Sequence, residues 1–373
     1  MTRVVQIGGF SHIKALPVGG DFPIAVQTMW KEPLREDALQ DTARRIARLG
    51  ELGCAILRFA APDEASAEIL GRLAGMVSMP LVADIHFDHR IALRCLDFPI
   101  AKIRINPGNI GGKEKVRALL EKAAEKGVPI RVGVNSGSLP ADIEKKVVAG
   151  LSRAQGLVEA AERELAIFDE FGFKNALVSM KATEIADTVS ACRIFSARSD
   201  APLHLGVTEA GPLVAGVARS SAALATLLAQ GIGDTMRVSL SDSIENEIAA
   251  GREICAAAAE LAALEGRPDA RLRRRGVKII SCPRCGRNGF DVAGFMGRWL
   301  DRLYALDADI TVAVMGCEVN GPAEARHADV GISGAGNKAL IFRAGKIERM
   351  VAMDDADEAF AQALEEAALS ARK

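Results

Sequence analysis

The sequence predicts an α/β protein with two parts, an N-terminal (β/α)₈ barrel of the TIM type and a C-terminal α+β domain. Short apolar runs recur about every 30 residues over the first two thirds of the chain, and segments of helical periodicity lie between them. Hydrophobic residues make up 49% and charged residues 25% of the 373 residues, which is typical of a globular chain too long for one small domain.

Eight apolar runs are predicted to form the barrel strands: residues 23–27, 55–59, 80–84, 101–105, 129–134, 175–179, 202–206 and 234–239. Helical periodicity is clearest at residues 37–52, 113–126, 158–171 and 220–229. Because a helix follows each strand, the strands are expected to run parallel and to end at the same face of the barrel.

A polar, basic stretch interrupts this pattern at residues 265–276, where Gly266 and Pro268 precede several arginines. We therefore expect a barrel over 1–264, a linker over 265–276 and a second domain over 277–373. In that domain the sequence predicts strands at 277–281, 310–315 and 340–343, and helices at 291–306 and 355–371.

Charge and hydropathy exclude several classes of protein. Lysine and arginine number 47 against 48 acidic residues, so no global basic field is present to bind nucleic acid or an anionic membrane. No apolar run reaches the roughly 18 residues of a spanning helix. Residues 1–20 contain Arg3, His12 and Lys14 but no apolar core of a secretory signal. We expect a soluble, cytoplasmic protein.

The seven cysteines fall into two groups. Four of them, Cys54, Cys95, Cys192 and Cys255, occur singly in apolar segments and are expected to be buried thiols. The other three follow predicted strands of the second domain. Cys282 and Cys285 form a C-x₂-C pair, and Cys317 comes later beside glycine. This group predicts a metal site.

The cysteine pattern leaves the fourth ligand of this metal site open. A second C-x₂-C pair is missing, so the site is not a Cys₄ zinc ribbon. His327 as fourth ligand would favour structural zinc, whereas Glu324 would suit an iron-sulfur cluster with one exchangeable iron. The residues favour iron-sulfur over zinc.

Polar side chains gather where the predicted barrel strands end, the face that carries the chemistry of such barrels. In chain order they are Arg58, Asp84, His86, Arg104, Asn106, Arg131, Asn135, Ser179, Lys181, His204, Thr208, Glu209, Arg237 and Ser239. Buried cations are costly unless a polyanion neutralises them. The glycine-rich turn at 106–112 also leads into a helix, a typical phosphate site. We expect a phosphate or diphosphate ligand.

Several of these segments together resemble the 4-hydroxy-3-methylbut-2-enyl diphosphate synthase family of the non-mevalonate isoprenoid pathway. The matching segments are 82–88 (VADIHFD), 102–111 (KIRINPGNIG), 133–139 (GVNSGSL), 203–211 (LHLGVTEAG), 233–239 (GDTMRVS) and both cysteine segments. The resemblance covers nearly the whole chain. It departs at residues 28–34, where the loop after the first strand is atypical.

The resemblance implies an iron-sulfur oxidoreductase that reductively opens and dehydroxylates 2-C-methyl-D-erythritol 2,4-cyclodiphosphate to 4-hydroxy-3-methylbut-2-enyl diphosphate. It implies two electrons from flavodoxin or ferredoxin and a head-to-tail homodimer. The implied ligands of a 4Fe-4S cluster are Cys282, Cys285, Cys317 and Glu324. The implied diphosphate-binding residues are Arg58, Arg104, Arg131, Lys181 and Arg237. The implied neighbours of the substrate are Asn106, Asn135, Ser179, His204, Thr208 and Ser239, with Asp84, His86, Glu209 and Glu324 as the catalytic candidates.

Two other functions remain open from the residues alone. Lys181 at the end of a strand among cations would suit a Schiff-base aldolase, although that leaves the cysteines of the second domain unexplained. A zinc-stabilised binding module would explain the cysteines but not the cations around the barrel.

Overall fold

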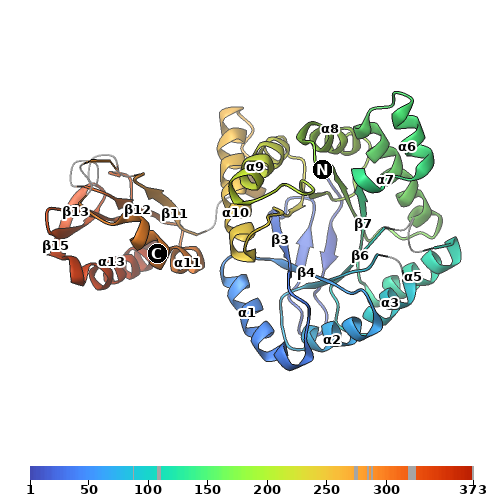
Figure 1. The fold of residues 1–373 in the computed structure, drawn as a ribbon, viewed down its shortest axis with the longest axis horizontal. Coiled ribbons are helices and arrows are strands. Elements are labelled where there is room, and N and C mark those ends of the chain that lie inside the picture. Colours follow the sequence, from blue (N-terminus) through green and yellow to red (C-terminus); the bar gives the residue numbers. More distant parts are fainter. Residues whose placement is uncertain are drawn as a thin grey trace. The chain divides into compact units, whose positions relative to one another are not determined.

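The computed structural model describes residues 1–86, 88–106, 111–272, 276–283, 285–286, 289–317 and 325–371. The chain divides into two compact units, Met1–Arg273 and Arg274–Lys373 (Figure 1). The first unit includes the short helix η3 (Ala270–Leu272), which lies within the stretch expected to be a linker. The Arg271 carbonyl accepts a hydrogen bond from the Ile24 amide, and the Arg271 guanidinium donates to the Gly231 and Gly233 carbonyls.

The first unit confirms the predicted barrel. Its strands are β3 (Ala25–Met29), β4 (Ile56–Ala60), β5 (Leu81–Asp84), β6 (Lys102–Ile105), β7 (Ile130–Asn135), β8 (Ala176–Lys181), β9 (His204–Leu205) and β10 (Thr235–Met236). They pair in parallel in the order β8-β7-β6-β5-β4-β3-β10-β9. A parallel bridge between Val178 and Leu203 joins the two ends of this order, so the sheet closes on itself.

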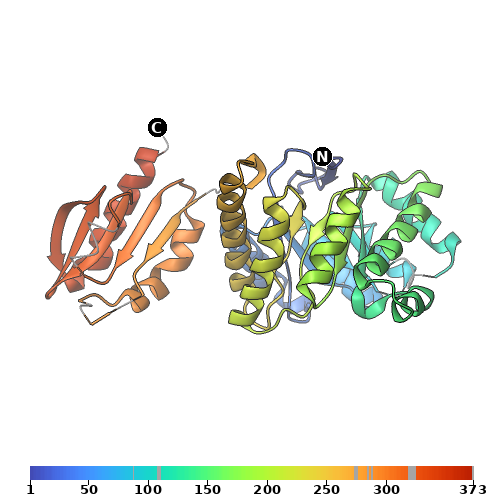
Figure 2. The same ribbon diagram turned by 90° about the horizontal axis from the view of Figure 1, so that it is seen from above.

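Helices surround these strands (Figures 1 and 2). They are α1 (Leu39–Glu51), α2 (Glu64–Ala74), α3 (His89–Cys95), α5 (Lys113–Lys126), α6 (Ala141–Val148), α7 (Arg153–Glu170), α8 (Ile185–Ser196), α9 (Leu213–Ala229) and α10 (Ile244–Leu264). Ser152 begins α7 with a capping box, and Gly127 ends α5 in the left-handed conformation at φ 67°. In the part of the chain that the structure describes, no helix has the length and apolarity needed to span a membrane.

The sequence analysis missed a hairpin that covers the amino-terminal end of the barrel. It consists of β1 (Val5–Ile7) paired antiparallel with β2 (Leu16–Val18). Val5, Ile7 and Val18 form one buried cluster with residues at the start of the barrel strands, among them Ala25 and Val82. Figure 2 shows this blue segment at one end of the barrel. The polar end of the barrel is therefore the opposite one.

The second unit has a five-stranded sheet in the order β11-β12-β13-β14-β15. Its strands are β11 (Lys278–Ser281), β12 (Thr311–Met315), β13 (Val330–Ala335), β14 (Lys338–Arg343) and β15 (Lys346–Ala352), and the first three are parallel. The sequence analysis missed β13, which has two glycines, and β15, an edge strand whose mostly exposed side chains conceal its pattern. Ala344 and Gly345 have φ 46° and 76°, which fits a tight two-residue hairpin turn before β15.

Two helices form the core of this unit with one face of the sheet. They are α11 (Val292–Ala305) and α13 (Ala356–Ala371). Phe295 stacks on Trp299 with ring centroids 5.5 Å apart, and Phe360 contacts both rings edge-on. The opposite face of the sheet carries a smaller cluster that includes Met315 and Phe342, with Cys282 packed against it. Cys282 therefore lies on the face of the sheet opposite the two helices.

Candidate active site

A pocket of about 330 Å³ opens at the carboxyl ends of the barrel strands. It is lined by Met29, Arg58, Asp84, His86, Arg104, Arg131, Asn135, Ser179, Lys181, Thr208, Glu209, Arg237 and Ser239. All of these except Met29 were singled out from the sequence. With Met29 included, the lining residues come from all eight strand positions. Parallel strands end at one face of a barrel, so side chains far apart in sequence meet here.

Asp84 at the end of β5 organises one side of the pocket. Its Oδ1 accepts a hydrogen bond from Arg104 Nη1 at 3.1 Å, and its Oδ2 lies 3.6 Å from Arg58 Nε and 3.4 Å from His86 Nε2. Burial raises the pKa of this carboxyl, but Arg58, His86 and Arg104 outweigh burial and hold the pKa below its usual range. Asp84 is therefore ionised and fixes the orientation of the two guanidinium groups.

Glu247 on α10 holds side chains on the other side of the pocket, although it is not itself a lining residue. Its side chain is fully buried and lies 3.3 Å from Arg237 and 3.0 Å from Lys31. It also accepts hydrogen bonds from the Thr28 hydroxyl at 2.5 Å and the Leu240 amide at 3.0 Å. The atypical loop after β3 is therefore tied to the site, because Thr28 and Lys31 share one carboxylate with Arg237.

Two cations of the pocket have no carboxylate partner among the described residues. Arg131 is 1% exposed and Lys181 is 7% exposed. Burial, together with the neighbouring arginines, lowers the pKa of Lys181 well below its usual value. Burial likewise lowers the pKa of Arg58 to about 10. Arg131 Nε and Nη1 find no hydrogen-bond partner within the described protein. Such an excess of buried positive charge favours an anionic ligand.

Two glycines make room for these cations. A Cβ atom on Gly133 would lie 2.7 Å from Arg104 Nε, and one on Gly206 would lie 2.6 Å from Lys181 Nζ. Both glycines occupy positions that face the barrel interior, where other barrels carry bulky aliphatic side chains. Their missing side chains provide the space in which the guanidinium and the amine lie.

The remaining predicted barrel residues differ in their placement. His204 is fully buried below the pocket, and its Nδ1 lies 2.8 Å from the Thr235 hydroxyl. Asn106 directly follows β6 and is half-buried but is not among the lining residues. The rest of its predicted phosphate loop, 107–110, lies outside the described residues. Glu209 is exposed, lines the pocket and has a left-handed backbone with φ 51°, an uncommon conformation for a residue other than glycine.

The sequence analysis missed three residues that shape the site. Met29 Sδ accepts a hydrogen bond from Arg58 Nη2 at 2.8 Å. Glu247 had a detectable signal, because it occupies the buried face of α10 together with Ile244, Ile248 and Gly251. Lys102 is fully buried in the barrel interior, two residues before Arg104.

Two of the predicted cluster residues follow neighbouring strands of the second unit's sheet. Cys282 directly follows β11 and Cys317 follows β12, and these parallel strands are in register with Ser281 opposite Val314. The Cys282 amide donates to the Val314 carbonyl and the Gly289 amide to the Gly316 carbonyl, so the loop that carries Cys285 begins and ends beside β12.

The chemistry of this donor set fits an iron-sulfur cluster, because thiolates are the protein ligands of such clusters and Cys282 and Cys317 follow neighbouring parallel strands. Among the described residues, no three His, Cys, Asp or Glu side chains converge closely enough to hold a metal ion. Glu324 lies outside the described residues, and His327 is exposed beside Arg326.

The four cysteines of the barrel have a different environment. Cys54, Cys95 and Cys192 are buried, and Cys255 is half-buried on α10. Burial raises the pKa of each of these thiols to about 12. They are therefore protonated at neutral pH and are not thiolate ligands.

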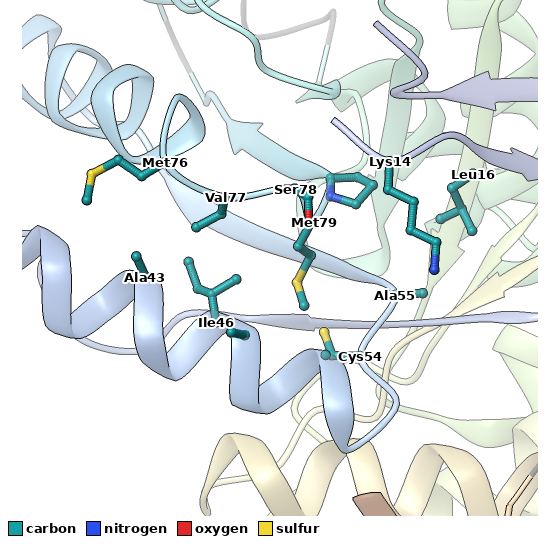
Figure 3. Close-up of a pocket in the computed structure, with 13 residues that line it drawn as sticks. Lys14, Leu16, Ala43, Ile46, Cys54, Ala55, Met76, Val77, Ser78 and Met79 are labelled. Carbon is teal, nitrogen blue, oxygen red and sulfur yellow. The ribbon is translucent and has the colours of Figure 1, made fainter. Parts of the chain in front are cut away.

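A second pocket of about 450 Å³ lies toward the amino-terminal end of the strands (Figure 3). Ile46 of α1, Cys54 and Met79 supply much of its apolar lining, and Lys14 is its one charged lining residue. It contains none of the predicted site residues. Although this pocket is larger than the one around Asp84, its lining has one charged residue, whereas the pocket around Asp84 is lined by several.

Comparisons with known proteins agree with this arrangement. Residues 3–252 match the GcpE TIM-barrel domain and residues 278–366 match the GcpE protein C-terminal domain. Three relatives carry the name 4-hydroxy-3-methylbut-2-en-1-yl diphosphate synthase (flavodoxin). The protein from Treponema pallidum is 51% identical, covering 95% of this chain and 88% of the relative. Those from Treponema denticola and Caldicellulosiruptor saccharolyticus are 49% and 42% identical, covering 94% and 95% of this chain and 92% and 96% of the relatives. The chain therefore belongs to the GcpE family of 4-hydroxy-3-methylbut-2-en-1-yl diphosphate synthases.

Proposed function

We propose that this protein reduces 2-C-methyl-D-erythritol 2,4-cyclodiphosphate to 4-hydroxy-3-methylbut-2-enyl diphosphate. In this reaction the ring opens at a C–O bond, a hydroxyl group leaves as water, and two electrons and two protons are taken up. One observation carries the proposal: five cations line one pocket of the barrel, in a family whose relatives are named for a diphosphate product.

The cations would bind the diphosphate. Arg58, Arg104, Arg131, Lys181 and Arg237 line the pocket, and Asp84 is the carboxylate among them that is held ionised. Because these groups are buried, they have little contact with water, and an anionic ligand would supply the hydrogen-bond acceptors that they need. The resulting hydrogen bonds are charge-assisted and form in a region of low dielectric constant. Asn135, Ser179, Thr208 and Ser239 supply neutral hydrogen-bonding groups around the carbon skeleton.

Protons would come from the rim of the pocket. His86 Nε2 contacts both Asp84 and Arg104, so its ring has a fixed orientation at the mouth. Glu209 lies on the opposite rim with an exposed carboxylate. Because Asp84 is held ionised by cations, His86 and Glu209 are the better proton donors to a leaving oxygen.

The electrons would come from flavodoxin or ferredoxin through a 4Fe-4S cluster, which supplies one-electron reduction when bound. Cys282, Cys285, Cys317 and Glu324 would hold it, with the carboxylate as the more labile ligand. We further propose that the barrel covers 1–264, that the cluster domain covers 277–373, and that the cytoplasmic enzyme works as a head-to-tail homodimer.

The test is turnover by anaerobically purified protein. We expect iron and sulfide in the purified protein, and conversion of the cyclic diphosphate by the protein with reduced flavodoxin. Arg104→Ala removes a buried cation next to the ligand and should weaken substrate binding by about 2 to 5 kcal/mol. Cys317→Ala should lose iron and turnover while the barrel binds the cyclic diphosphate normally. Zinc without sulfide, or wild-type affinity in Arg104→Ala, would contradict the proposal.

A further inference from the structure

Lys102 of β6 lies in the barrel interior beneath the substrate pocket. Its side chain is fully buried, and its Nζ donates one hydrogen bond, to Gln27 Oε1 at 3.1 Å. Alternate residues of a strand face the same side, so Lys102 and Arg104 both point inward and are separated along the strand by roughly 7 Å. Lys102 does not line the pocket. Barrel interiors are normally filled by aliphatic side chains, so an amine at this depth requires an explanation.

The surroundings of Lys102 are cationic or neutral on nearly every side. The polar groups of the surrounding strands are Gln27 (β3), Arg58 (β4), Asp84 (β5), Arg131 (β7), Lys181 (β8), His204 (β9) and Thr235 (β10). Asp84 is the one carboxylate of this set, and it pairs with Arg104 and Arg58. No carboxylate forms an ion pair with Lys102 among the described residues.

An ammonium group at this position would be desolvated, without a counter-ion and beside two guanidinium groups. Burial, Arg131 and Arg58 all lower the pKa of Lys102 well below its usual value. The guanidinium groups stay charged, because arginine does not lose its proton in proteins. Buried amines such as Lys102 are thus the groups that adjust when the total charge of the barrel interior changes.

We propose that Lys102 is uncharged in the free protein and takes up one proton from solvent when a cyclic diphosphate binds in the pocket above it. The bound dianion neutralises the arginines that disfavour an ammonium at Lys102. Lys102 acts as a positioning residue without touching the ligand. Its charge adds to the attraction between the barrel and the ligand, and the opened diphosphate product, which has a further ionisable group, is attracted by the same charge. The proposal rests on the proposed function for the identity of this ligand.

The expected pH dependence follows from linkage. Each phosphorus of a cyclic diphosphate carries one strongly acidic hydroxyl, so the ligand does not titrate near neutrality and any proton taken up is bound by the protein. Below the free-state pKa of Lys102 the amine is already charged, and affinity does not depend on its protonation. Between the free-state and bound-state values, affinity falls by up to about tenfold per pH unit as pH rises.

Calorimetric titration with the cyclic diphosphate, without reductant, measures this uptake directly. Binding enthalpies in HEPES and in Tris, which differ in ionisation enthalpy, give the number of protons bound. We expect Lys102→Met to take up about one proton fewer than wild type. Gln27→Glu supplies a carboxylate that keeps Lys102 protonated in the free protein, so this variant should also lose the uptake. The surface variant Lys126→Met should behave as wild type.

A second measurement needs no ligand and therefore separates this inference from the proposed function. A lysine whose pKa is lowered by folding destabilises the protein below that pKa, and this cost disappears as pH rises. The folding equilibrium constant of wild type relative to Lys102→Met should rise by up to about tenfold per pH unit from the folded-state pKa of Lys102 up to its unfolded value of about 10. Trp30 fluorescence in a Trp299→Phe background follows the barrel alone.

Absence of ligand binding by wild type would contradict the proposed function. A stability difference between wild type and Lys102→Met that does not change with pH would overturn the inference about Lys102. Wild-type proton uptake in the Lys102→Met variant would overturn it too, because Lys181 or His204 would then be the group that titrates.

Discussion

Gly133→Ala should weaken diphosphate binding while removing no polar or charged group. The new methyl group would lie 2.7 Å from Nε, 2.9 Å from Nη2 and 3.2 Å from Cζ of Arg104, and no other neighbour within 4 Å comes closer. Since ordinary contacts begin at 3.4 Å, the guanidinium must retreat by about 0.7 Å. Its 3.1 Å hydrogen bond to Asp84 then stretches beyond a useful length.

The magnitude follows from the interaction that is lost. The displaced guanidinium is also misaligned with the ligand, and a hydrogen bond to a charged group contributes about 1.5 to 3 kcal/mol, which corresponds to roughly tenfold to a hundredfold in affinity. Arg104 keeps its charge, so long-range attraction of the ligand is unchanged. We therefore expect a smaller loss of affinity than for Arg104→Ala, and the weakened Arg104–Asp84 hydrogen bond should also lower the stability of the barrel.

Calorimetric titration with the cyclic diphosphate, without reductant, measures this loss, and thermal unfolding checks the fold. Gly137→Ala is the matched control, because a Cβ at Gly137 meets nothing within 4 Å. The reasoning would be refuted if Gly133→Ala bound the ligand like wild type, or if Gly137→Ala lost as much affinity.

Three further predictions concern pH, the assembly and the cluster. Cations hold the pKa of Asp84 below its unfolded value, so the ionised carboxylate contributes to stability above about pH 4, and this contribution is lost as pH falls through the folded-state pKa. The free energies of unfolding of wild type and Asp84→Asn, measured with urea, should therefore converge in acid. Mixed Cys282→Ser and Arg104→Ala subunits should regain part of the activity if sites are shared between chains, and no recovery after verified exchange would exclude sharing. Glu324→Ala should lower turnover far more than substrate binding, whereas iron loss in His327→Ala with normal turnover in Glu324→Ala would reverse the ligand assignment.

The positions of the barrel strands followed from the sequence because each strand is a short apolar run between helical segments. β9 and β10 proved shorter than predicted. After β10 the Arg237 amide still bonds to the Leu205 carbonyl, but the Leu240 amide bonds to the Glu247 side chain instead of to a neighbouring strand. β13 was not predicted because glycines interrupt its apolar run. β15 was not predicted because most of its side chains are exposed, so it lacks a clear pattern of alternating apolar residues.

Much of the pocket was predictable, because parallel strands bring their last polar residues to one face. The contacts of the supporting residues were not predictable. Glu247 could be found on the buried face of its helix, but nothing in the local sequence links it to Lys31 more than two hundred residues away. The role of Gly133 was equally hidden, because a glycine shows its purpose only through the side chain that occupies its space.

The contrast between the two sets of cysteines makes the protein suited to chemical labelling. The barrel thiols, Cys54 among them, are sheltered and stay protonated, so an alkylating reagent at neutral pH reacts with them slowly. Cys285 is exposed on the other unit. With the proposed iron-sulfur cluster bound, its cysteine ligands would be protected, so the number of carbamidomethyl groups counted by mass spectrometry on native protein would report how many molecules lack that cluster, without any measurement of turnover.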